Sequence, residues 1–361
     1  MWAPGRVNLI GEHIDYHGLA VLPMALERRV EVKFRPQADR RIVARSTSYG
    51  RREFAWSQPL TPVAAGDWEN YLRAAAQAIA GKWGALDGID ASITSDLPAA
   101  AGLSSSSALL VAFTLALLAA NGRGATFQEL MEILPDGEQF VGTRGGGMDH
   151  AAALGSKAGC ATLVEFAPLA ARHIPVPRDW RFLVAHSLQT AEKSGPAREE
   201  YNRRRAAGDT ALARLGLRRY ADALEIAPAA AAKLAEGPER DSFLHTTSEA
   251  LRVRAAVSAM ERDDGEAFGR LLLASHASLR DRLRVSCAAL DRLVEAAMES
   301  GALGARLTGA GFGGCAVILC RSRDAAQVRR GLIERFYADR GEFDQGRHLI
   351  DAVPGAGALH P

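Results

Sequence analysis

The chain has 361 residues, which is more than one hydrophobic core usually spans, so we expect two domains or one large two-lobed unit. Apolar residues make up 48% of the sequence and charged residues 24%, which is typical of a globular protein. The 44 basic and 42 acidic residues leave a net charge of +2, which argues against nucleic acid or a membrane surface as a partner.

The longest apolar run, residues 108–120, is too short to span a bilayer, and the first residues show no apolar leader. We therefore expect a cytoplasmic protein. The four cysteines form no C-x-x-C pair. Cys315 and Cys320 lie an odd number of residues apart in an expected strand, so they should face opposite sides of it. This pattern predicts buried thiols rather than disulfides or a metal site.

The segment PGRVNLIGEHIDYHG, residues 4–18, combines a buried-strand pattern with several charged side chains. A solvated loop would not need its apolar residues, and a core strand would not need its charges. The combination predicts a strand that delivers polar groups to a partly buried site. A zinc-protease helix needs H-E-x-x-H, and the order is different here. The candidate site residues of this segment are Arg6, Glu12, His13 and Asp15.

The spacing of apolar residues predicts the next strands and helices. Residues 28–57 alternate and predict a β-meander, residues 68–82 predict an amphipathic helix, and residues 89–98 predict a strand that runs into a loop. Residues 108–120 are apolar on nearly all faces and predict a buried helix. Gly122 follows this helix, as a C-terminal glycine commonly does.

The stretch GLSSSSA, residues 102–108, precedes that buried helix. A helix N-terminus offers unpaired N–H groups and a positive dipole end, and small side chains let an anion come close. We therefore predict phosphate binding here. A plain serine N-cap is the alternative, although four serines exceed what one cap needs.

The stretch GTRGGGMDH, residues 142–150, places Asp149 directly after a glycine run. The glycines let the backbone approach a ligand closely, which makes Asp149 a candidate site residue. A tight turn that ends in an aspartate cap explains the same pattern, and both alternatives stay open.

The second half begins with short strands at residues 161–169 and 181–190, and residues 196–300 are predicted to be helical. The motif GAGFGG, residues 309–314, matches G-x-G-x-x-G but precedes a strand, whereas a dinucleotide site needs it to open a helix. A final strand is expected near residue 350. The order of elements predicts an α+β protein with domains at residues 1–170 and 171–361.

Three separated motifs resemble the signatures of the galactokinase branch of the GHMP sugar and metabolite kinases: PGRVNLIGEHIDY, DLPAAAGLSSSSAL and LTGAGFGGC. GTRGGGMDH resembles the segment that carries the catalytic aspartate of that family, and the similarity runs nearly end to end. The resemblance implies the two-lobed GHMP-kinase fold, with ATP and a sugar in the cleft between the lobes.

Carried over by motif position, the resemblance implies that Arg6 and Asp149 are the catalytic pair. It also implies sugar contacts for Glu12, His13, Asp15, Gly146 and Tyr201. Expected ATP contacts are Gly102, Leu103, Ser104, Ser105 and Ser106, with Trp68 near the adenine. Expected Mg²⁺ ligands are Ser106 and Glu138, although Pro135 and Gly137 interrupt a stretch that is helical in relatives.

The implied reaction is in-line transfer of the γ-phosphoryl group of ATP to the anomeric oxygen of D-galactose. Asp149 would accept or orient the C1 hydroxyl proton, while Arg6 would hold Asp149 ionised and neutralise the transferred group. Small molecules are the only expected partners of a monomer or weak homodimer.

Two alternatives stay open. Gly145 and Gly147 replace larger residues beside the sugar, and the missing side chains would leave room for a 2-acetamido group, as in an N-acetylgalactosamine 1-kinase. A non-catalytic sugar-sensing regulator is the other alternative. Such relatives tend to lose the catalytic acid or parts of the serine loop, residues 102–108. This sequence retains Arg6, Ser104–Ser106 and Asp149.

Overall fold

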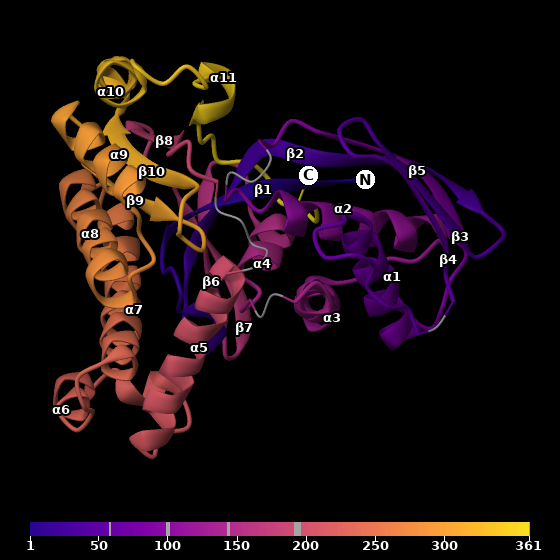
Figure 1. Cartoon of the computed structure of the whole chain (residues 1–361), viewed down its shortest axis with the longest axis horizontal. Coiled ribbons are helices and arrows are strands. Elements are labelled where there is room, and N and C mark those ends of the chain that lie inside the picture. Colours follow the sequence, from indigo (N-terminus) through magenta and orange to yellow (C-terminus); the bar gives the residue numbers. More distant parts are fainter. Residues whose placement is uncertain (58, 99–101, 143–144, 191–195, 361) are drawn as a thin grey trace.

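Two mixed lobes of sheet and helix make up the molecule (Figure 1). The computed structural model describes residues 1–57, 59–98, 102–142, 145–190 and 196–360, without the side chains of residues 138, 139 and 196–198. The fold is α+β, as the sequence predicts. Within the described residues, no helix is long and apolar enough to cross a membrane.

The first lobe is built on a five-stranded sheet in the order β1-β2-β5-β3-β4. Its strands are β1 (Trp2–Ile10), β2 (Leu22–Gln37), β3 (Arg41–Ser46), β4 (Gly50–Ala55) and β5 (Gly88–Ser95). The predicted meander is wrong, because β5 lies between β2 and β3 and runs parallel to β3. The alternating pattern indicates which side chains are buried, but it does not indicate which strand lies beside which.

The described part of this lobe also has the helices α1 (Glu69–Trp83), α2 (Ser105–Ala120), α3 (Phe127–Phe140) and α4 (Met148–Gly155). Helices α2 and α4 pack on the sheet, and α1 and α3 pack mainly against the other helices. The strongly apolar α2 packs on β1 and β2 and is buried over most of its length, as predicted. Helix α3 continues through Pro135 and Gly137. Its packing against α1 and α4 outweighs the local cost of a proline in the helix.

The second lobe has a four-stranded sheet in the order β11-β8-β10-β9. Its strands are β8 (Trp180–His186), β9 (Gly304–Thr308), β10 (Cys315–Arg321) and β11 (Leu349–Asp351). The side chains of Cys315 and Cys320 pack into different hydrophobic clusters, which confirms that they face opposite sides of β10. The glycine motif connects the antiparallel strands β9 and β10, so it does not open a helix.

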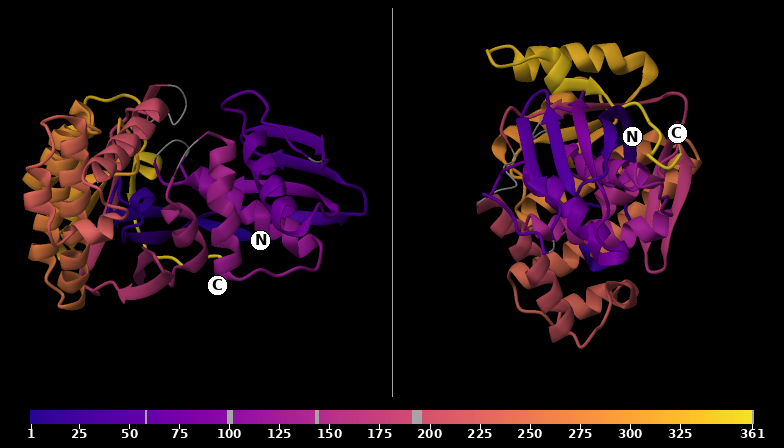
Figure 2. Two further views of the ribbon diagram at one scale, coloured as in Figure 1. Left: turned by 90° about the horizontal axis from the view of Figure 1, so that it is seen from below. Right: turned by 90° about the vertical axis from the view of Figure 1, so that its right-hand side faces the viewer.

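Helices form most of the remainder, as predicted for residues 196–300. They are α5 (Pro196–Arg214), α6 (Ala227–Ala231), α7 (Pro238–Glu261), α8 (Gly265–Ser278), α9 (Ala288–Glu299), α10 (Ala325–Leu332) and α11 (Gln345–His348). Figure 2 shows the long helices of this lobe stacked at one end of the molecule, with the five-stranded sheet at the other.

Two further segments link the lobes. The hairpin of β6 (Cys160–Phe166) and β7 (Leu169–Pro175) contacts β2 and α7. The domain boundary predicted at residues 170 and 171 falls within β7 and stays a prediction. Near the C-terminal end, Pro354 pairs with Leu26 of β2, so the chain returns to the first lobe (Figure 1).

Candidate active site

The two predicted catalytic residues are in contact. Arg6 lies on β1, Asp149 lies in the first turn of α4, and Arg6 Nε donates to Asp149 Oδ1 at 2.6 Å. The Ser104 hydroxyl donates to Asp149 Oδ2, and the Ser107 hydroxyl lies 3.4 Å from the same oxygen. Three elements far apart in the sequence therefore position one carboxylate with charged and neutral donors.

Arg6 is bonded to the loop that precedes α2. The Arg6 Nη1 atom donates to the Gly102 carbonyl at 2.7 Å, and the Arg6 backbone N–H donates to the Leu103 carbonyl at 3.1 Å. Ser104 precedes the helix with a left-handed backbone, φ +55°, and its side chain makes no capping hydrogen bond. The plain serine cap is therefore not what this hydroxyl provides, since it bonds Asp149 instead.

A cavity of about 850 Å³ lies beside this serine loop. Ser104, Ser105 and Ser106 line it from the first lobe, and Ala310, Gly311 and Gly313 line it from the second. Trp68 lines the cavity too, and its indole N–H donates to the Tyr49 carbonyl at 3.1 Å. The predicted phosphate-binding serines and the predicted adenine neighbour therefore share one cavity. Further lining residues include Ser46, Thr47, Ser48, Tyr71 and Thr308.

The glycine loop, residues 309–314, lies against the serine loop. A Cβ atom on Gly309 would lie 3.3 Å from the Gly102 carbonyl oxygen, and one on Gly311 would lie 2.2 Å from the Val285 carbonyl oxygen. Both glycines also have positive φ values. Only glycine fits at position 311, so the motif allows two backbone segments to approach each other closely.

Asp15 and Gly146 are in contact with each other, and Asp15 lies near Asp149. The Gly146 N–H donates to Asp15 Oδ2 at 3.1 Å. A Cβ atom at Gly146 would lie 2.3 Å from the Asp15 backbone, so this position requires glycine. Burial raises the pKa of Asp15 to about 6, and the nearby negative charge of Asp149 adds to the effect.

His13 is held between the two lobes. Its Nε2 atom lies 3.1 Å from the Ala310 carbonyl oxygen, and its Nδ1 atom lies 2.9 Å from the Tyr16 hydroxyl. Burial lowers the pKa of His13 to about 4. A carbonyl can only accept, so the neutral ring donates from Nε2 and accepts at Nδ1. The ring of Tyr201, on α5, lies 5.1 Å from the His13 ring between centroids.

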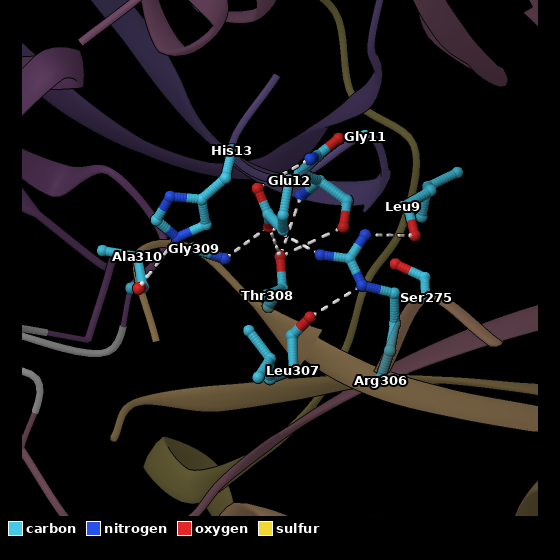
Figure 3. A network of polar contacts seen from close by, with 12 residues as sticks. Leu9, Gly11, Glu12, His13, Ser275, Arg306, Leu307, Thr308, Gly309 and Ala310 are labelled. Carbon is cyan, nitrogen blue, oxygen red and sulfur yellow. Dashed lines mark hydrogen bonds and ion pairs between the residues drawn. The ribbon is translucent and has the colours of Figure 1, made fainter. Parts of the chain in front are cut away.

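Glu12 is almost fully buried and is surrounded by donors from the protein (Figure 3). Its Oε1 atom accepts from the Gly309 N–H at 2.5 Å and from the Thr308 hydroxyl at 3.3 Å, and it forms an ion pair with Arg306 Nη2 at 2.8 Å. Its Oε2 atom accepts from the Asn8 amide at 2.8 Å. The Oε2 atom can still accept another hydrogen bond. The predicted contact between Glu12 and the sugar stays a prediction.

Sequence reasoning missed Arg306, although a signal was present. Arg306 is the one charged residue of β9 and immediately precedes the LTGAGFGG motif, yet its side chain is 0% exposed. The same contrast, a charge inside a buried strand, singles out the segment around Arg6. Glu249 of α7, whose carboxylate accepts from the Gly11 N–H at 3.0 Å, was missed too, because a glutamate is ordinary in a long polar helix.

The expected Mg²⁺ contact of Glu138 and the expected space beside Gly147 have different outcomes. The side chain of Glu138 lies outside the described residues, so its predicted Mg²⁺ contact stays a prediction. Within the described residues, no group of three histidine, cysteine or acidic side chains could hold a metal ion by itself. The prediction that Gly147 leaves space beside the sugar is wrong. A Cβ atom at this position would lie 3.2 Å from Met131 and 3.3 Å from Pro135, both on α3.

Comparison with known proteins places this geometry in a family. The model of the galactokinase galactose-binding signature matches residues 1–36, the GHMP kinases N terminal domain matches residues 70–157, and the GHMP kinases C terminal model matches residues 256–338. The galactokinase of Roseiflexus sp. is 36% identical over 94% of this chain and 88% of its own length. The chain belongs to the galactokinase family of GHMP kinases.

Other relatives agree with this assignment. The galactokinase of Mycobacterium tuberculosis is 36% identical, with 93% of each chain covered. The structure of Lactococcus lactis galactokinase complexed with galactose is 27% identical, covers 99% of this chain and 93% of its own, and superposes with a TM-score of 0.91. The Methanococcus jannaschii mevalonate kinase, at 17% identity and TM-score 0.64, shares the fold. The chain is thus a sugar kinase of the galactokinase type, and ATP is the co-substrate of GHMP kinases.

Proposed function

We propose that this galactokinase-family enzyme transfers the γ-phosphoryl group of ATP to the anomeric hydroxyl of D-galactose, giving galactose 1-phosphate and ADP. The observation that carries the proposal is the meeting of Arg6, Asp149 and Ser104 at the edge of the serine-lined cavity. A phosphate donor in the cavity and a sugar beside Asp15 would then both adjoin the Asp149 carboxylate. We place the enzyme in the cytoplasm, as a monomer or weak homodimer.

In the proposed reaction, Asp149 orients the C1 hydroxyl and accepts its proton. The C1 oxygen forms a bond to the γ-phosphorus as the bond from that phosphorus to the bridging oxygen of ADP breaks. Arg6, fixed by its bonds to Asp149 and Gly102, neutralises negative charge on the transferred group. Such positioning and charge stabilisation are the main protein contributions to phosphoryl transfer.

The phosphates of the nucleotide would lie at the start of α2, where Ser105 and Ser106 line the cavity and the helix N-terminus supplies backbone N–H groups. The adenine would lie near Trp68. Mg²⁺ usually takes only one or two protein ligands and keeps phosphate and water ligands. Ser106 on the cavity wall fits that requirement, and Glu138 is the second proposed ligand. When bound, Mg²⁺ supplies neutralisation of the phosphate charge.

For the sugar, we propose contacts from Glu12, His13, Asp15, Gly146 and Tyr201. Asp15 is suited to read an axial 4-hydroxyl, since a carboxylate accepts from two neighbouring hydroxyls at once. A substrate that misplaces one of these hydroxyls leaves a buried polar group without its partner. Galactose should therefore be preferred over glucose by about a hundredfold or more in kcat/KM.

An ATP-consumption assay over a panel of sugars tests the proposed function. The panel contains galactose, glucose, galactosamine, N-acetylgalactosamine, galacturonate and arabinose, and we expect galactose to be the best substrate. A preference for N-acetylgalactosamine would support the alternative kinase, and comparable rates with glucose would contradict the role of Asp15. Gly147→Ile is not a useful probe of the acetyl group, because its side chain would be forced against α3.

A further inference from the structure

Residues of the second lobe bond to the backbone of Gly11 and Glu12 and to the side chain of His13. These three residues belong to the segment of residues 4–18 that carries expected sugar contacts, called the sugar motif below. Glu249 Oε1 accepts from the Gly11 N–H at 3.0 Å. His245 Nε2 donates to the Glu12 carbonyl at 3.0 Å, and the Ala310 carbonyl accepts from His13 Nε2 at 3.1 Å. The conformation of this first-lobe segment is therefore set by residues that follow it by more than two hundred positions.

Arg306 adds further contacts to the same region (Figure 3). Its Nη1 atom donates to the Leu9 carbonyl of β1 at 3.0 Å, its Nε atom donates to the Leu307 carbonyl of β9 at 2.8 Å, and its Nη2 atom pairs with Glu12 Oε1 at 2.8 Å. One rigid guanidinium thus contacts both lobes. The planar fork of arginine suits such a task better than the single ammonium of lysine.

The oxygen that Arg306 holds also accepts from the Gly309 N–H at 2.5 Å. Gly309 is the first residue of the glycine loop, and Ala310, Gly311 and Gly313 of that loop line the proposed nucleotide cavity. Glu12 Oε1 is therefore a direct link between the sugar motif and a wall of that cavity. Desolvation offsets much of the attraction within a buried ion pair, so stability alone is a weak explanation for this arrangement.

We propose that Arg306 is a positioning residue that couples sugar binding to nucleotide binding, by holding Glu12 against the amide of Gly309. The inference rests on the proposed function, because it assumes a sugar at the Glu12 motif and a nucleotide in the cavity. A sugar that orders the Glu12 carboxylate also orders Gly309 and the loop beyond it. Each ligand then strengthens the binding of the other by the same factor.

Titration calorimetry measures this coupling without turnover. The dissociation constant of a non-hydrolysable ATP analogue is determined with and without saturating galactose, and that of galactose with and without the analogue. For the wild-type enzyme we expect galactose to tighten the analogue by about fivefold or more, and the reverse factor to be equal. In Arg306→Lys, which keeps the charge but loses the fork, this factor should fall. In Arg306→Met it should approach one.

Arg321→Met is the matched control. Arg321 lies at the far end of the adjacent strand β10, and its Nη1 atom pairs with Asp179 at 3.5 Å and Asp263 at 3.4 Å. This variant should lower the melting temperature but leave the coupling factor at the wild-type value. Should Arg306→Met fail to fold, Arg306→Lys together with the control still provides the comparison.

Three results would overturn the inference: no coupling in an active wild-type enzyme, wild-type coupling in folded Arg306→Lys, or equal loss of coupling in Arg321→Met. The last result would show that Arg306 contributes only to general stability. A wild-type enzyme that phosphorylates no sugar contradicts the proposed function instead, so the two failures are distinguishable.

Discussion

The carboxylate of Asp149 is the group on which the proposed chemistry depends. Asp149→Asn keeps the size of the side chain and an oxygen that can accept from Arg6, so the fold and sugar affinity should be retained. Because the amide cannot accept the C1 proton, kcat should fall by about two to four decades. Steady-state kinetics and galactose titration measure the two effects. A variant with wild-type kcat would show that Asp149 is not the base.

Asp15 predicts a pH dependence of sugar binding. With a pKa raised to about 6, its carboxyl is ionised above that pH and protonated below it. The ionised form accepts from two sugar hydroxyls, so kcat/KM for galactose should fall by about tenfold per pH unit below pH 6, while the KM for ATP stays nearly constant. Asp15→Asn should weaken sugar binding and remove this pH dependence of the galactose KM.

The same carboxyl should also reduce the stability of the ligand-free enzyme. Between its ordinary pKa near 3.8 and the raised value, the folded state binds more protons than the unfolded state, so the contribution of Asp15 to stability falls as pH rises. Asp15→Asn should therefore melt at a higher temperature than the wild type at pH 7 and at about the same temperature near pH 3.5. A variant that is less stable at both pH values would contradict this interpretation.

Single residues differ in how far the sequence could place them. The contact between Arg6 and Asp149 was predictable from the family resemblance, because the two motifs carry its catalytic pair, whereas the glycine run alone left the role of Asp149 open. The bond from Ser104 to Asp149 was not, because it depends on a left-handed backbone at one residue. The prediction that Gly147 leaves space beside the sugar is wrong, because a side chain at this position would point at α3. The glycine run in the sequence does not reveal that packing.

At the scale of elements, the start of α2 separates two tasks within one run of serines. Ser104 and Ser106 both line the cavity, but the Ser104 hydroxyl also bonds Asp149, so we expect different roles for the two side chains. Ser106→Ala should raise the KM for ATP and the Mg²⁺ concentration needed for half-maximal rate. Ser104→Ala should mainly lower kcat, by about tenfold, the size expected for loss of one hydrogen bond to a charged group. Kinetics across a Mg²⁺ titration measure both, and identical profiles for the two variants would argue against separate roles.

Most helices and strands were predictable, because the spacing of apolar residues and the local composition indicate them. The buried α2 and the helices between residues 196 and 300 are of this kind. The position of β5 between β2 and β3 was not predictable from local pattern, because strand neighbours depend on how the whole sheet packs. The continuation of α3 through Pro135 has the same cause, since contacts with other helices decide it.

The whole molecule should lose stability in mild acid. Burial lowers the pKa values of His13 and His245 to about 4, so between pH 6.5 and 4 the unfolded state binds more protons than the folded state. The free energy of unfolding should therefore fall as pH falls through this range, and the opposing shift of the Asp15 pKa offsets only part of the loss. Urea unfolding at pH 7 and pH 5 measures the difference. An equal or higher urea midpoint at pH 5 would contradict the assignment of two neutral buried histidines.

The return of residues 354–359 to the first lobe has a consequence for the order in which the molecule is made. The Gly355 N–H donates to the Ala25 carbonyl of β2 at 2.8 Å, and the Leu359 N–H donates to the Leu154 carbonyl of α4 at 3.0 Å. During synthesis, β2 and α4 leave the ribosome long before these partners exist. The lobe that contains the proposed catalytic pair can therefore complete its native backbone pairing only after residues 354–359 have emerged from the ribosome.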